Sequence, residues 1–182
     1  MKRILGVGAF LAGISVMTLA APVQVSLLPQ IQTSTISGSV SGVSINILAG
    51  QHQNVTGIEL GMINLDSGNF TGLQVGGYNQ DGFMSGVQVG AINYAVTYGG
   101  IQSGLVNLAS VGHGMQLGIF NRCDENYGIQ IGLVNASNYV NGVQLGLLNS
   151  TTALFGMQLG ALDIHRMNAL PTVAIGYGFD FI

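Results

Sequence analysis

A repeated segment of eight residues constrains this chain more than any other feature. The segment from Gly86 to Asn93 reads Gly, apolar, Gln, apolar, Gly, apolar, apolar, Asn. Units of this kind recur along the chain, and from Gly72 to Gly156 they are spaced by 14 residues every time. A short repeat that cannot bury its own apolar face must stack on its neighbours, so the chain is predicted to form a repeat architecture. The other units begin at Gly57, Gly72, Gly100, Gly114, Gly128, Gly142 and Gly156.

The centre of each unit, apolar-Gln-apolar, alternates with the period of a β-strand. Glycine at the first and fifth positions disfavours a helix by roughly 1 kcal/mol per residue relative to Ala. Two closed all-β architectures then remain. One is a β-solenoid of eight or nine 14-residue coils, with like residues about 4.8 Å apart. The other is an outer-membrane β-barrel, in which successive repeats are antiparallel strands.

The alternation within the repeat favours the solenoid over the barrel. Membrane-spanning strands need about 9–11 residues that alternate throughout, with aromatic girdles at both interfaces. Here the sixth and seventh positions are adjacent and both mostly apolar, which breaks the alternation, and the chain has no Trp. We therefore predict an all-β solenoid and keep the barrel as the alternative.

A solenoid predicts a direction for each column of side chains. The second and fourth positions, such as Val87 and Val89, are expected to build a stacked aliphatic core. Gln88 would belong to an outward ladder and Asn93 to a second ladder at a corner, because stacked amides hydrogen-bond along such columns. Gly90 would permit a tight bend or a close backbone approach. Positions nine to fourteen vary and are expected to be surface connections.

The chain divides into four predicted segments. Residues 1–20 have a basic start, an apolar run and small residues before a cut after Ala20, which predicts a signal peptide; a retained membrane anchor is the alternative. Residues 21–41 form a lead-in with a strand near Val23 to Leu27, and residues 42–163 are the tandem repeats. Residues 164–182 alternate from Thr172 to Ile182 and are expected to be a capping strand.

Composition excludes one class of partner. Only 6% of the residues are charged, against about 25% in typical soluble proteins, but 48% are apolar, so the chain should be ordered. Without residues 1–20, the strong bases are Arg122 and Arg166 and the acids number seven, which gives two minus seven, or −5. No basic patch is then available for phosphates, so nucleic-acid binding is not expected.

The cysteine and the histidines show no pattern of a reactive or metal-binding site. Cys123 is the only cysteine, so it is interpreted as a tolerated residue in a loop, with an intermolecular disulfide as the alternative. His52, His113 and His165 lie outside the repeated positions and are interpreted as residues of surface connections. We assign no catalytic, cofactor-binding or metal-binding residue, and we expect no cofactor.

The acidic residues do not recur as a column. Asp66 and Asp81 share the tenth position, but Ala, Ala and Cys follow there, so the calcium ladder of some repeat proteins is not predicted. Glu59 replaces Gln at the third position and is expected to hydrogen-bond with the Gln ladder. Asp124 and Glu125 are expected to be solvated.

The repeat resembles that of a bacterial family of surface-repeat proteins described from leptospires and their relatives. Those proteins carry tandem Gly-Val-Gln-Leu-Gly-Leu-Val-Asn units with a 14-residue period. The units Gly128 to Asn135 and Gly142 to Asn149 match this pattern closely, and the resemblance covers about Gly57 to Asp163. It implies export and surface display, and it brings no catalytic residue.

These features predict an exported structural protein, displayed at the cell surface or outer membrane, that contacts a host or neighbouring macromolecule without catalysis. The periplasm is the alternative location. An integral outer-membrane barrel or pore is the alternative function, favoured by the export signal, the low charge and the alternating C-terminal strand. Outer-membrane association and self-association through the solenoid ends both stay open.

Overall fold

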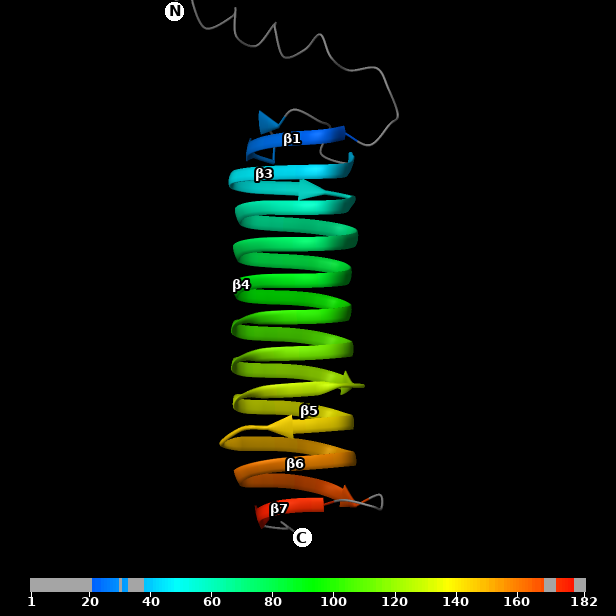
Figure 1. The fold of residues 1–182 in the computed structure, drawn as a ribbon, viewed down its shortest axis with the longest axis vertical. Coiled ribbons are helices and arrows are strands. Elements are labelled where there is room, and N and C mark those ends of the chain that lie inside the picture. Colours follow the sequence, from blue (N-terminus) through cyan, green and yellow to red (C-terminus); the bar gives the residue numbers. More distant parts are fainter. Residues whose placement is uncertain (1–20, 30, 33–37, 169–172, 179–182) are drawn as a thin grey trace, which may run out of the picture.

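The structure is a computed structural model, and it describes residues 21–29, 31–32, 38–168 and 173–178. The chain winds into a long β-solenoid of about nine coils (Figure 1). The predicted solenoid is therefore confirmed, and the chain does not form the barrel alternative. The described residues include no helix long and apolar enough to cross a membrane. The predicted signal peptide, residues 1–20, lies outside the described residues.

All strands belong to one continuous sheet that wraps around the rod. Its order is β2-β1-β3-β4-β5-β6-β7, and every neighbouring pair is parallel except β1 with β2. The strands continue around the bends, so the longest one makes several coils by itself (Figure 1). The strands are β1 (Ala21–Leu28), β2 (Ile31–Gln32), β3 (Ser39–His52), β4 (Asn54–Asn126), β5 (Ile129–Leu145), β6 (Leu148–Asn168) and β7 (Val173–Gly178).

The register of the sheet reproduces the period of the sequence. Gly142 pairs with Gly156, and Gln144 pairs with Gln158, so like residues lie above one another at an offset of 14 residues. Near the N-terminal end the offset is 15 residues, because Gly42 pairs with Gly57. The repeat pattern thus becomes a set of columns that run along the rod.

The columns point in the opposite direction from the one predicted. The third-position side chains from Glu59 to Gln158 are all 0% exposed. The second and fourth positions face outward, with Ile58 42% and Leu60 41% exposed. The predicted aliphatic core and outward Gln ladder are therefore wrong, and the interior is lined by amides.

The variable segments explain this orientation. The thirteenth position, predicted to be surface, is buried in most coils and supplies large apolar side chains such as Met84, Tyr98 and Leu154. The tenth position is buried as well, for example at Ala95 and Cys123. These residues fill half of the interior, and the Gln and Asn columns fill the rest with their polar groups paired, which removes most of the cost of burying them.

Glycine at the first position allows the coils to approach closely. Gly100 has a φ of +134°, a conformation that favours glycine, and a Cβ there would overlap the carbonyl oxygen of Gly86. The equivalent glycines repeat this contact from coil to coil. A side chain in this column would force the stacked coils apart.

Both ends of the described rod carry short strands. The strand expected at Val23 to Leu27 is confirmed as part of β1, which pairs in parallel with β3. The alternating C-terminal segment forms β7, which pairs in parallel with β6 at the far end of the rod (Figure 1). Residues 169–172 and 179–182 lie outside the described part. The capping role of residues 164–182 stays a prediction.

Candidate functional site

The third position forms a hydrogen-bonded ladder of glutamines inside the rod. Gln88 Nε2 donates to Gln74 Oε1 at 2.8 Å, and the same contact repeats in every coil up to Gln158, which donates to Gln144 at 2.6 Å. Each donor belongs to the later coil. The N–H groups of this ladder therefore all point toward the N-terminal end of the rod.

The eighth position forms a second ladder, of asparagines, that runs the other way. Asn79 Nδ2 donates to Asn93 Oδ1 at 2.8 Å and also to the carbonyl oxygen of Val89 at 3.0 Å. Gly90 makes room for these amides, because a Cβ there would lie 2.6 Å from Asn79 Nδ2. Here each donor belongs to the earlier coil, so the N–H groups point toward the C-terminal end.

A carboxylate receives the last donor of each ladder. Gln74 Nε2 donates to Glu59 Oε2 at 2.9 Å, and Asn149 Nδ2 donates to Asp163 Oδ1 at 2.7 Å. The predicted hydrogen bonding of Glu59 with the Gln ladder is thus confirmed. An ionised carboxylate has no N–H or O–H to donate, which suits it to the donor end of a ladder.

The first coil reaches the same amide column with exchanged residues. Asn46 stands in the fifth-position column, where later coils have Gly, and Gly50 stands in the eighth, where they have Asn. Asn46 Nδ2 still donates to Asn64 Oδ1 at 2.7 Å, and a Cβ on Gly50 would overlap the Asn46 side chain. The Asn ladder therefore begins in this coil, although the sequence motif is not visible there.

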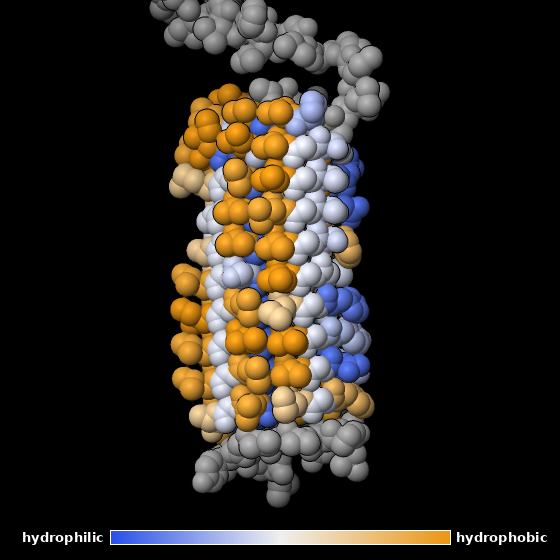
Figure 2. Space-filling view, in the orientation of Figure 1, coloured by the Kyte–Doolittle hydropathy of each residue, from blue (hydrophilic) through white to orange (hydrophobic). Residues whose placement is uncertain are grey.

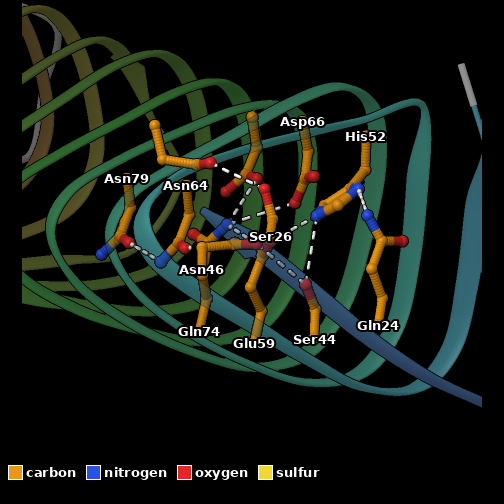
Figure 3. Close-up of polar contacts among 12 residues, drawn as sticks. Gln24, Ser26, Ser44, Asn46, His52, Glu59, Asn64, Asp66, Gln74 and Asn79 are labelled. Atoms are coloured by element: carbon orange, nitrogen blue, oxygen red, sulfur yellow. Dashed lines mark hydrogen bonds and ion pairs between the residues drawn. The ribbon is translucent and has the colours of Figure 1, made fainter. Parts of the chain in front are cut away.

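The candidate functional site lies in the N-terminal coils, where four titratable side chains meet. We call His52, Glu59, Asp66 and Asp81 the acid–histidine cluster. His52 and Asp66 come from one side of the coil and Glu59 from the opposite side (Figure 3). Their exposed fractions are between 0% and 2%, so the cluster is closed to solvent.

His52 is held at both ring nitrogens. Its Nδ1 lies 3.3 Å from Gln24 Nε2, and its Nε2 lies 3.1 Å from Ser44 Oγ. The same Nε2 lies 3.2 Å from Glu59 Oε1, which forms a buried ion pair when the imidazole is protonated. The ring therefore has a fixed position between the coils.

The carboxylates share a small number of amide donors. Asn46 Nδ2 donates to Glu59 Oε1 at 2.7 Å, and Gln74 Nε2 lies within 3.2 Å of oxygens of Glu59, Asp66 and Asp81. Asp66 Oδ1 is buried and has no hydrogen-bond partner among the described residues. One carboxylate oxygen in the cluster is thus left without a donor.

Burial and mutual repulsion separate the titration of the three carboxyls. Burial raises the pKa of Asp66 to about 11, with the charges of Glu59 and Asp81 adding to it. Burial also raises the pKa of Asp81 to about 7, although hydrogen bonds from Gln74 and Asp66 oppose this shift. For Glu59, burial would raise the pKa, but hydrogen bonds with His52, Asp66 and Gln74 and the charge of His52 hold it below its usual value. At neutral pH, Glu59 is ionised and Asp66 carries a proton.

The cluster brings together metal-ligand atoms that the sequence did not suggest. One ligand atom each from His52, Glu59 and Asp66 lie within 4.8 Å of one another. The interpretation of His52 as a residue of a surface connection is wrong, because the register places it directly above Asp66 in the tenth column. The 14-residue spacing between these two residues is the signal that could have found it.

The remaining residues singled out from the sequence lie apart from this cluster. Cys123 is a buried free thiol, not a loop residue, and burial raises its pKa to about 12. A thiol in this interior cannot reach a second chain, which disfavours the intermolecular disulfide. His113 is exposed on the outside, where it stacks on Tyr127 at 4.9 Å between ring centroids. The side chain of His165 lies outside the described part.

The solvation predicted for the two adjacent acids is confirmed. Glu125 is exposed, and the side chain of Asp124 is 42% exposed. Asp124 Oδ1 accepts a hydrogen bond from Arg122 Nη2 at 2.8 Å. An exposed pair of this kind contributes little to stability.

The outside of the rod carries a second candidate feature. We call the outward side chains of the second and fourth positions the aliphatic face. They form two hydrophobic stripes along the rod, with pale columns beside them (Figure 2). No charged residue occupies either position in the units from Gly57 onward. The most exposed members are Ile45, Ile58, Leu60, Leu73, Val75, Val89, Ile101, Ile131 and Leu159.

Comparison of the chain with protein-family models, with curated proteins and with solved structures gives no significant match. The resemblance to the leptospiral surface-repeat family therefore stays a prediction from the repeat itself.

Proposed function

We propose that this protein is an exported structural rod that acts at the cell surface, without catalysis, by packing its aliphatic face against the same face of a second copy. The second copy is then the neighbouring macromolecule that the sequence leads us to expect. The observation that carries the proposal is the continuous, charge-free aliphatic face. Export and surface display rest on the signal-peptide pattern and on the family resemblance.

The size of the aliphatic face suits a stable protein interface. Nine coils at about 4.8 Å extend roughly 40 Å, and five strand residues at about 3.3 Å span roughly 17 Å. The face then measures about 700 Å², close to the roughly 800 Å² per partner of a standard interface. Exposed apolar patches larger than a few hundred Å² on a soluble protein usually mark an interaction site.

The regularity of the face favours a second copy as the partner. Both copies carry stripes with the same coil spacing, and the glycine columns beside the stripes leave grooves that the stripes of the partner can enter. Identical β-sheet faces interdigitate in this way in dry zipper interfaces. The charge of the acidic chain does not oppose the contact, because the exposed charges of Arg122, Asp124 and Glu125 lie at other positions of the coil.

An anionic lipid surface is a weaker match for this face. Helices and patches that bind such surfaces combine apolar residues with Lys and Arg. Among the side chains that the structure describes, Arg122 is the one Lys or Arg, and Asp124 pairs with it. Electrostatic attraction to anionic lipid is therefore not available.

Sedimentation velocity of the mature chain over a wide concentration range tests the proposal. We expect a monomer–dimer equilibrium that the double variant Val75→Lys/Val89→Lys weakens by at least about tenfold, because each dimer would bury unpaired charges. The matched control, Gln80→Lys/Asn138→Lys, places the same charges at exposed positions outside the face and should dimerise normally. A wild-type chain that stays monomeric, or two variants that dimerise equally, would contradict the proposal.

Two further measurements separate the alternatives. If the monomeric chain floats with neutral phosphatidylcholine vesicles, the face binds lipid and the second-copy proposal is wrong. Fractionation of intact cells followed by protease shaving tests display. Protein that stays in the cytosol, or that is protected in intact cells, would overturn the surface location.

A further inference from the structure

The acid–histidine cluster carries more negative charge than its surroundings balance. Glu59, Asp66 and Asp81 are buried together, and His52 is the one basic side chain among them. With all three carboxyls ionised and the imidazole protonated, two negative charges would remain in the interior. Each buried, unpaired ion costs several kcal/mol. A proton or a cation is needed here, and the raised pKa of Asp66 shows the same imbalance met by a proton.

The geometry of the cluster is close to that of a metal site. His52 Nε2 and Glu59 Oε1 are 3.2 Å apart, and an Asp66 oxygen completes a set of three atoms within 4.8 Å of one another. Ligand atoms about 2.0–2.2 Å from a tetrahedral zinc ion lie roughly 3.3–3.6 Å apart. A side-chain rotation of Asp66 by about 1 Å closes the remaining gap.

Asp66 is free to make that movement. Its Oδ1 is buried and has no hydrogen-bond partner among the described residues, although the oxygen lies in a polar interior. Buried polar atoms without partners are rare in folded proteins and call for an unmodelled ion or water. Turning this oxygen toward His52 and Glu59 breaks no hydrogen bond of its own.

We propose that the acid–histidine cluster binds one divalent transition-metal ion through an imidazole nitrogen of His52 and one carboxylate oxygen each from Glu59 and Asp66. One nitrogen and two oxygens suit zinc or manganese, whereas calcium takes six to eight oxygen ligands. Ser44 Oγ, 3.1 Å from His52 Nε2, is a hydroxyl within reach of the same ion. This proposal is independent of the contact made by the aliphatic face.

The residues around the cluster are arranged to orient these ligands. When His52 Nε2 binds the metal, its Nδ1 carries the proton, and the Gln24 amide 3.3 Å away can turn its oxygen to accept it. Asn46 and Gln74 donate to the two oxygens of Glu59. The ion would link β3, which holds His52, to β4, which holds both carboxylates, and so stabilise the first coils of the rod.

Metal retention by the mature chain tests the site. The protein is stripped with chelator, refolded separately with Zn²⁺, Mn²⁺ or Ca²⁺ because the cluster is closed to solvent, and gel-filtered before elemental analysis. We expect about one Zn²⁺ or Mn²⁺ per chain, no retained Ca²⁺, and a higher melting temperature with the bound ion. Wild-type protein that retains neither transition metal would overturn the proposal and leave the proton as the balancing charge.

Matched variants assign the ligands. Glu59→Gln restores the residue that the following coils carry at this position, so it keeps a rung of the ladder while removing a ligand. His52→Gln removes the nitrogen ligand, and both variants should lose stoichiometric binding. The controls are His113→Gln, an exposed histidine, and Asp163→Asn, a buried carboxyl in the other ladder. Equal retention in all four variants would show that the ion binds elsewhere.

A spectroscopic measurement covers the case in which the variants fail to fold. Wild-type protein loaded with Co²⁺ should show the visible absorption of a low-coordinate site, and X-ray absorption of the zinc form should show one imidazole among oxygen ligands. A spectrum of fully hydrated Co²⁺, or a zinc site with no imidazole, would contradict the assignment.

Discussion

Glu59 and Asp163 occupy the donor ends of two hydrogen-bonded ladders that run in opposite directions inside the same rod. Gln74 donates to Glu59 at 2.9 Å near the N-terminal end, and Asn149 donates to Asp163 at 2.7 Å near the C-terminal end. In each ladder, this residue is the carboxylate that replaces the amide. The two departures from the repeat therefore share one physical role.

This arrangement follows from the polarity of an amide chain. Each amide that donates forward and accepts from behind polarises its neighbours, so positive character accumulates at the donor end. A carboxylate accepts that last donor and strengthens the bond with its charge. Because the ladders are antiparallel, their dipoles oppose each other and the rod acquires no large net dipole from them.

The end of the Asn ladder gives a first prediction. Asp163→Leu removes the acceptor of Asn149 and should lower the free energy of unfolding by about 1–3 kcal/mol, the cost of an unpaired buried donor. Asp163→Asn keeps an acceptor oxygen and should cost less than about 1 kcal/mol. Urea denaturation followed by circular dichroism measures both. Equal losses in the two variants would show that the acceptor at this position does not matter.

The middle of the Gln ladder gives a second prediction, which reverses the usual rule for core and surface. Gln102→Met leaves Gln116 without its acceptor and Gln88 without its donor, so stability should fall by about 2–4 kcal/mol. Leu105→Gln, at a side chain that is 56% exposed, should change stability by less than about 0.5 kcal/mol. Denaturation midpoints compare the two. An unaffected Met variant would argue against an amide-lined interior.

Tyr98 gives a third prediction. Its hydroxyl is buried and lacks a partner among the described residues, and its ring occupies the space that a side chain at Gly112 would need. Tyr98→Phe removes the unpaired hydroxyl and should raise the free energy of unfolding by about 1 kcal/mol. Gly112→Ala should instead destabilise, because its Cβ would overlap the ring. A destabilised Phe variant would mean that the hydroxyl has a partner.

Cys123 gives a fourth prediction, on reactivity and pH. Burial raises the pKa of its thiol from 9.0 to about 12. The unfolded chain therefore loses this proton at a lower pH than the folded chain, so the stabilisation is complete below pH 9 and is lost as the pH rises toward 12. The native thiol should resist iodoacetamide at pH 8 and react once urea unfolds the chain. In Cys123→Ala, the fall in stability between pH 9 and 12 should be smaller.

Much of the architecture could be predicted from the sequence. The 14-residue spacing between units such as Gly142 and Gly156 became the register of the parallel sheet, because like residues stack when each repeat makes one coil. Glu59 could be placed in the Gln ladder for the same reason. The candidate site could not be found in this way. His52 and Asp66 align only through a register shift between Asn46 and Ala49 that the motif does not show.

The sequence by itself determined the period, the strand character and the stacking of like residues, because these depend on spacing and on local backbone preference. Only the tertiary structure decided which side of each strand is the inside. Alternation places Val87 and Val89 on one side and Gln88 on the other, and this pattern reads the same in both orientations. Closing the coil resolved it, because Met84 and Tyr98 filled the interior and left the Gln and Asn columns paired within it.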